Sequence, residues 1–139
     1  MDQTKTQKIE QTIISNVLKQ FYEVADYITI NISSPNTEDL RNFHDQKKLD
    51  ELLKVLEKVK KDLNSKTPIA VKVSPDIDDK EIIKISEVLL SNNIEAIIIS
   101  NTSDTTREKL KNTQGYQKGG LSGKPIESKS SELIRKFYK

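Results

Sequence analysis

Apolar residues recur along this chain in two alternating patterns, which together predict four helices and three strands. Spacings of three and four residues predict amphipathic helices over about residues 8–25, 46–63, 78–92 and 126–138. Between the helices lie short runs in which most positions are apolar, and these predict strands over 27–32, 68–73 and 95–100. Strands that are apolar on both faces are typical of a parallel sheet covered by helices.

The alternation of helices and strands predicts right-handed crossover connections within one parallel sheet. A sheet of three parallel strands has two open edges and is a poor independent fold. No internal repeat or second domain is evident, so we interpret residues 1–139 as a single segment of a larger α/β protein. A doubly wound sheet and a (β/α)8 barrel both satisfy this pattern.

Composition excludes several classes of function. The chain has no cysteine and one histidine, His44, which excludes thiolate chemistry and disfavours a metal site, so no metal is predicted. The net charge of +2, with basic and acidic residues interspersed, gives no reason to expect nucleic acid. No run approaches the roughly 20 apolar residues of a membrane span, and residues 1–12 lack a signal-peptide pattern. A cytoplasmic location is therefore expected.

Polar side chains gather where each predicted strand ends. NISSPNT (31–37) follows the first strand, Lys72 lies within the second, and SNTS (100–103) follows the third. Each has a plainer explanation, namely a proline-centred turn, a lysine that reaches solvent, and an Asx turn or helix cap. Ligands of both candidate architectures bind at the carboxyl ends of the strands, so the joint placement favours a site.

All four glycines of the chain fall in one loop, which precedes the last predicted helix; they are Gly115, Gly119, Gly120 and Gly123. Such a loop lets backbone amides approach an anion, and the helix N-terminus adds its dipole. The spacing is not that of a P-loop, and a flexible linker is the alternative. Near the third predicted helix, Asp76 and Asp78 stand at the expected N-cap.

Four motifs in this order, YITINISSPNTEDLR, PIAVKVSPD, IIISNTS and GGLSGKP, closely resemble dihydroorotate dehydrogenases of the quinone-linked class (class 2). The resemblance extends from about residue 8 to residue 139. It implies a partial (β/α)8 TIM barrel, with about three parallel strands and flanking helices, from the central part of an FMN-binding domain. The implied activity is FMN-dependent oxidation of dihydroorotate to orotate in pyrimidine biosynthesis, with the electrons passed to quinone.

The resemblance also implies a role for individual residues. Ser34 would be the catalytic base, because this class carries serine where the soluble class carries cysteine. Asn31 would contact both flavin and substrate, and asparagine matches the amide-like donors and acceptors of the orotate ring. The other implied flavin contacts are Lys72, Ser100 and Gly123, the last of these at the phosphate. The other implied substrate contacts are Asn36, Asn101 and Thr102.

Full-length members of this class are peripheral on the membrane, and the part that docks there and receives quinone has no counterpart in the sequence. One alternative is a truncated or remnant gene product that binds no flavin on its own. Other fragments of the same barrel are candidate partners. Another flavin-dependent barrel, such as a dihydropyrimidine-type enzyme, is disfavoured because those relatives tend to use cysteine in place of the serine of NISSPNT.

Overall fold

The computed structural model describes residues 12, 14–33, 45–105, 107, 110–111 and 119–138. Three parallel strands form one sheet in the order β1-β2-β3; they are β1 (Ile28–Asn31), β2 (Ile69–Val73) and β3 (Ala96–Ile99). The predicted strands, their parallel pairing and their adjacency are therefore confirmed. All three strands end on the same side of the sheet, which we call its carboxyl end.

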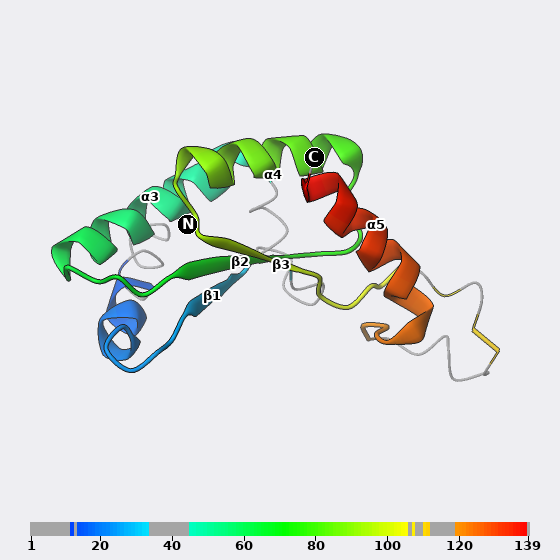
Figure 1. Ribbon diagram of the computed structural model, residues 1–139, viewed down its shortest axis with the longest axis horizontal. Coiled ribbons are helices and arrows are strands. Elements are labelled where there is room, and N and C mark those ends of the chain that lie inside the picture. The colour runs from blue at the N-terminus through cyan, green and yellow to red at the C-terminus, as the bar shows by residue number, and fades with distance from the viewer. Residues whose placement is uncertain are drawn as a thin grey trace, which may run out of the picture.

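Two long helices, α3 (Gln46–Asp62) and α4 (Asp79–Ser91), pack side by side on one face of the sheet (Figure 1). Asp45 caps α3 by accepting hydrogen bonds from the amides of Lys47 and Lys48. Asp78 caps α4 in a reciprocal capping box with Glu81. In both helices, the residue directly before the first helical position therefore provides the N-cap.

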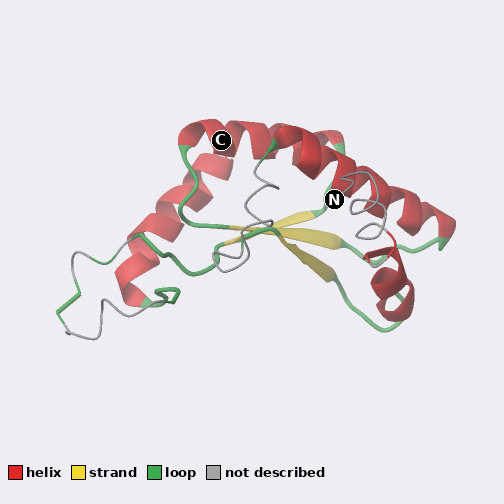
Figure 2. Ribbon diagram, turned by 180° about the vertical axis from the view of Figure 1, so that it is seen from behind, coloured by secondary structure: helices red, strands yellow, loops and turns green. Residues whose placement is uncertain are grey.

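The last helix, α5 (Glu127–Tyr138), is entered through the short 3-10 turn η3 (Lys124–Ile126) and contacts β3 and α4. Figure 2 shows it from behind, running beside the sheet from the glycine-rich segment toward α4. Upstream of β1, residues 14–21 are helical, within the predicted range 8–25. Among the helices in the described ranges, none combines the length and the apolar character needed to cross a bilayer.

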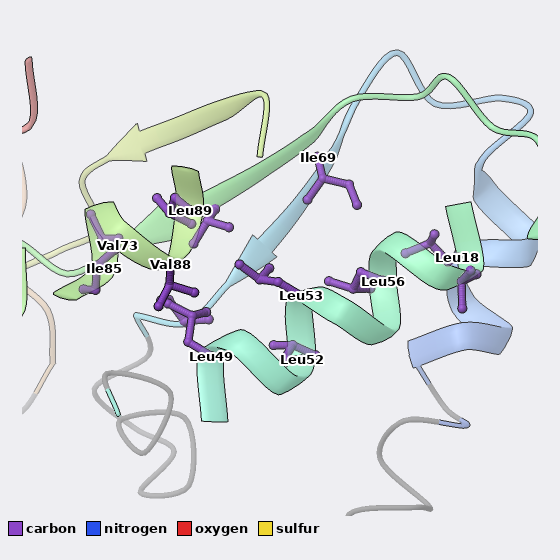
Figure 3. Close-up of a cluster of buried hydrophobic side chains, with 13 residues drawn as sticks. Leu18, Leu49, Leu52, Leu53, Leu56, Ile69, Val73, Ile85, Val88 and Leu89 are labelled. Atoms are coloured by element: carbon purple, nitrogen blue, oxygen red, sulfur yellow. The ribbon is translucent and has the colours of Figure 1, made fainter. Parts of the chain in front are cut away.

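The hydrophobic core lies between the sheet and the pair α3 and α4 (Figure 3). Leu49, Leu53 and Leu56 share one face of α3 at helical spacing and are at most 1% exposed. Val71 and Val73 of β2 face them and are fully buried. Burial of each such side chain stabilises the fold by about 1.5–3 kcal/mol. The apolar interface between β2 and α3 therefore determines which face of the sheet the helices cover.

Candidate active site

Strand register places Asn31 and Lys72 side by side near the carboxyl end of the sheet. The Cα of Asn31 pairs with that of Lys72, which pairs in turn with Ile98. Successive residues of a strand point to opposite faces, and in-register partners point to the same one. Because Val71 and Val73 are buried against the helices, Asn31 and Lys72 point to the other face, which we call the open face.

Lys72 brings a positive charge to the open face. The residue is partly buried, and no carboxylate of the described residues forms an ion pair with its ammonium group. A lysine flanked by apolar strand residues is costly to desolvate without a partner. Its charge is therefore available to an electron-rich ligand.

Asn31 has its side-chain amide oriented by the chain that follows it. Its Oδ1 accepts hydrogen bonds from Ser33 N at 3.2 Å and from Ser33 Oγ at 2.6 Å. Both of these groups donate, which identifies the amide oxygen as the end that faces Ser33. The Asn31 NH2 group is therefore the end left for a ligand acceptor.

Asn101 connects the ends of all three strands. Its backbone N donates to the carbonyl oxygen of Val73 at 3.0 Å, which extends the ladder between β2 and β3 by one bond. Its side-chain Nδ2 donates to the carbonyl oxygen of Ser33, also at 3.0 Å. Ser33 is only 4% exposed, so Asn101 satisfies a buried carbonyl that follows β1.

Ser100 has its hydroxyl directed toward α5. Its Oγ lies 3.0 Å from Ser130 Oγ and 3.2 Å from the carbonyl oxygen of Asn101. The side chain thus joins the end of β3 to the helix layer.

The segment after β3 is in close contact with the glycine-rich loop. A Cβ at Gly120 would lie 1.9 Å from Thr102 Oγ1, so only glycine fits against Thr102. Next to this contact, Ser103 and Leu121 exchange two backbone hydrogen bonds, from Ser103 N at 2.9 Å and from Leu121 N at 2.7 Å. Two motifs that are separate in the sequence therefore form one unit.

Gly123 marks the turn into the final helix. Its φ of 75° and ψ of −150° lie in a region that residues with a Cβ rarely adopt. Its carbonyl oxygen accepts from Ile126 N at 3.1 Å, and Pro125 occupies the first turn of η3, where no amide is needed. The loop thus ends at a helix N-terminus, where backbone dipoles favour an anion.

Sequence reasoning missed a cluster centred on Asp76, in the loop between β2 and α4. Asp76 accepts hydrogen bonds from Ser103 Oγ at 2.7 Å, Thr105 Oγ1 at 2.8 Å and Asp104 N at 3.0 Å, and it forms an ion pair with Lys129 of α5. Partial burial alone would raise the pKa of the Asp76 carboxyl, but Lys129 and the three hydrogen-bond donors hold that pKa well below its usual range.

We call Asp76, Ser103, Thr105 and Lys129 the Asp76 cluster. The sequence placed Asp76 beside Asp78 as a capping residue, whereas only Asp78 caps α4. The sequence feature that could have indicated this cluster is the acidic residue Asp76 in the SPD motif, which directly follows β2.

Two predicted site residues, Ser34 and Asn36, lie outside the described residues. Within the described ranges, no three histidine or carboxylate side chains come together as a metal site. A hollow of about 360 Å³ is found at the opposite, amino-terminal end of the sheet and contains none of the predicted site residues. Its lining includes Glu57, Lys60, Asn64, Asn92 and Glu95.

A parallel sheet covered by helices on one face, with polar side chains at its carboxyl end, is the arrangement found in a segment of a (β/α)8 barrel. The family model described as dihydroorotate dehydrogenase matches residues 3–139. The chain therefore belongs to the dihydroorotate dehydrogenase family.

Relatives with established names agree with this assignment. The chain is 42% identical over 127 residues to dihydroorotate dehydrogenase (quinone) of Vibrio parahaemolyticus, covering 87% of this chain and 37% of that protein. It is 40% identical over 126 residues to the protein of the same name from Chromobacterium violaceum, covering 88% and 37%. The crystal structure of DHODH from Eimeria tenella in complex with ferulenol matches with a TM-score of 0.87 at 26% identity, covering 92% of this chain and 39% of that one. The chain thus spans little more than a third of the length of these relatives.

Proposed function

We propose that this chain supplies the central part of an FMN-dependent, quinone-linked dihydroorotate dehydrogenase, which oxidises dihydroorotate to orotate. The observation that carries the proposal is the convergence at the carboxyl end of the sheet. Asn31 and Lys72 are in register on the open face, and Asn101 reaches the loop after β1. Each of these three placements restricts or desolvates a polar side chain, which is unfavourable in itself. A bound flavin and substrate would account for all three.

Lys72 is the proposed partner of the flavin ring. The chemistry that FMN supplies when bound is the acceptance of a hydride. A lysine on the open face, with no carboxylate beside it among the described residues, stabilises the negative charge that this transfer leaves on the ring. Gly123 and the helix N-terminus that follows it are the proposed site of the phosphate, because backbone amides and the helix dipole meet there.

Asn31 and Asn101 are proposed to recognise the substrate ring with opposite polarity. Asn31 uses its oxygen on Ser33 and offers its NH2 group, whereas Asn101 uses its NH2 group on Ser33 and offers its oxygen. Dihydroorotate carries both N–H donors and C=O acceptors, so this pair can satisfy one of each. A ligand that left either group unpaired would lose roughly 1–3 kcal/mol per group. Asn36 and Thr102 are the other proposed substrate contacts.

Ser34 is proposed as the catalytic base. A serine hydroxyl is a weak base by itself, so its placement and its neighbours determine its effectiveness. Ser33, the residue directly before it, is held by Asn31 on one side and by Asn101 on the other. These hydrogen bonds hold in place the residue directly before Ser34. Ser100 is retained as a proposed flavin contact through its backbone, since its hydroxyl faces α5.

The finished site requires more strands than the structure describes. Within the described sheet, β1 and β3 each pair on one side only, so the open face is not enclosed. We therefore expect the 139-residue chain to bind FMN weakly by itself, and other fragments of the same barrel to be its partners. The cytoplasmic location and the electron acceptor, quinone, stay predictions.

Flavin titration of two preparations tests the proposal. In one, the chain is alone; in the other, it replaces the matching segment of the Vibrio parahaemolyticus relative, which supplies the rest of the barrel. The second should bind FMN and reduce it with dihydroorotate. Ser34→Ala should retain flavin but slow its reduction by about 10²–10⁴-fold. A chimera that folds and binds no FMN would leave the alternative, a remnant without flavin binding, as the better account.

A further inference from the structure

The Asp76 cluster joins three segments that are distant in the sequence. Asp76 itself lies in the loop between β2 and α4, Ser103 and Thr105 follow β3, and Lys129 is in the first turn of α5. The Lys129 ammonium also donates to Thr105 Oγ1 at 3.1 Å. The Asp76 side chain is only 14% exposed, so its four donors replace most of the water it would otherwise bind.

Ser103 connects the Asp76 cluster to the two loops of the proposed site, the segment after β3 and the glycine-rich loop. Its hydroxyl donates to Asp76, while its backbone exchanges two hydrogen bonds with Leu121. Thr102 directly precedes Ser103, and Gly120 and Gly123 lie on either side of Leu121. The contact between Thr102 and Gly120 leaves no room for a Cβ, so a shift of one loop displaces the other.

We propose that Asp76 is a positioning residue that holds in place both the loop with Thr102 and the glycine-rich loop with Gly123. Its consequence for binding rests on the proposed function, in which Thr102 contacts the substrate and Gly123 the FMN phosphate. Asp76 does not itself contact either ligand. It acts through Ser103 and Leu121, and through Lys129 it sets the start of α5, whose N-terminus follows Gly123.

A carboxylate is required at this position because every group around it donates. An ionised carboxyl has two oxygens and only acceptor sites, which matches two hydroxyls, one amide and one ammonium. An asparagine would present an NH2 group to at least one of these donors. Asp76→Asn therefore keeps the side-chain volume nearly constant, removes the negative charge, and replaces one acceptor oxygen with an NH2 donor.

Asp79 offers a matched control. It lies at the start of α4, its side chain is 77% exposed, and it also forms an ion pair with α5, through Lys136 at 2.7 Å. Asp79→Asn removes the same charge and one ion pair to the same helix, but it touches neither Ser103 nor Leu121.

The test compares amide hydrogen exchange in the 139-residue chain with FMN affinity and steady-state kinetics in the barrel completed by the Vibrio parahaemolyticus relative. Asp76→Asn should speed exchange at the Ser103 and Leu121 amides by about tenfold or more, and leave the amides of β2 unchanged. In the completed barrel it should weaken FMN binding and raise KM for dihydroorotate, each by about tenfold, with a smaller effect on kcat. Asp79→Asn should stay within about twofold of the parent on every measure.

Unchanged exchange at Ser103 and Leu121 in Asp76→Asn would overturn the proposed anchorage. Faster exchange without any loss of FMN or substrate affinity would overturn its role in binding and reduce Asp76 to a stabilising residue. A completed parent barrel that binds no FMN would overturn the proposed function instead. In that case the exchange comparison between the two variants still decides whether Asp76 holds the two loops.

Discussion

Asn101 donates a side-chain hydrogen bond to the carbonyl oxygen of Ser33 at 3.0 Å, and this bond passes across the end of β2 to join the segments that follow β3 and β1. No contact within the sheet ladder links β1 with β3, because β2 lies between them. Backbone hydrogen bonds tie each segment to β2, from Ile32 N to Lys72 O and from Asn101 N to Val73 O, and the Asn101 side chain adds the direct link between them.

Asn101→Ala should destabilise the chain by about 1–3 kcal/mol, because it leaves the buried Ser33 carbonyl without its side-chain donor. Urea unfolding followed by circular dichroism measures the difference. Gln46→Ala is the control, since its 3.3 Å hydrogen bond to Glu87 is exposed and should contribute less than about 0.5 kcal/mol. Equal midpoints for the two variants would show that the bond across β2 contributes nothing.

Lys72→Met should leave the fold as stable as before or more stable, because methionine fills a similar volume without a charge to desolvate. In the completed barrel, the same change should lower FMN affinity by about tenfold or more. Lys58→Met, on the exposed side of α3, should alter neither property. Full flavin occupancy in Lys72→Met would exclude Lys72 as the flavin partner.

Gly120→Ala should separate the glycine-rich loop from the segment after β3, because the new Cβ would lie 1.9 Å from Thr102 Oγ1 and 2.4 Å from Thr102 Cβ. Forcing a methyl group into such a space costs about 1–3 kcal/mol. The double variant Gly120→Ala, Thr102→Gly removes both clashing atoms and should recover most of the loss in thermal stability. Failure of the second substitution to restore stability would mean that the loss does not come from the contact with Thr102.

Leu56→Ala should cost about 2–5 kcal/mol, since Leu56 is fully buried between α3 and the sheet. Leu90→Ala on α4 removes the same atoms from a side chain that is 78% exposed, and should change stability by less than about 0.5 kcal/mol. Thermal unfolding of the pair tests whether the observed core is the one that supports the sheet. Similar losses for both leucines would contradict it.

The lowered pKa of Asp76 predicts how stability depends on pH. An aspartate in the unfolded chain titrates near pH 4, whereas the native carboxyl beside Lys129 stays ionised to lower pH. The contribution of Asp76 should therefore be constant above about pH 5 and decline as the pH falls below about 4. The difference in unfolding midpoint between the parent and Asp76→Asn should shrink over that range. A difference that changes between pH 6 and 8 would point to another group.

The strands and helices follow from the sequence because burial imposes its own period on the apolar residues. The orientation of Lys72 does not, since a strand that is apolar at nearly every position gives no alternation from which to read a face. Register against Asn31, and burial of the valines on either side, supply that information only once the sheet is formed. The roles of all the predicted site residues, including Ser34 and Asn36, rest on resemblance and stay predictions.

The Asp76 cluster could not be predicted for a different reason. Its partners lie 27, 29 and 53 residues farther along the chain, at Ser103, Thr105 and Lys129. Local patterns report on neighbours within a turn or two, so an acidic residue beside a helix start is assigned to the nearest plausible task, which is capping. Its true environment is a product of the fold.

The paired backbone bonds between Ser103 and Leu121 have a thermodynamic consequence. Suppose that a phosphate orders one loop and a substrate ring orders the other. Because the loops are bonded together, the first ligand to bind orders both, and the second binds with a smaller loss of conformational entropy. The two affinities are then reciprocally linked, so that orotate should tighten FMN by the same factor by which FMN tightens orotate. Titrating each in the presence of the other, in the completed barrel, would measure that factor. A value of one would mean that the loops accept their ligands independently, despite the bonds that join them.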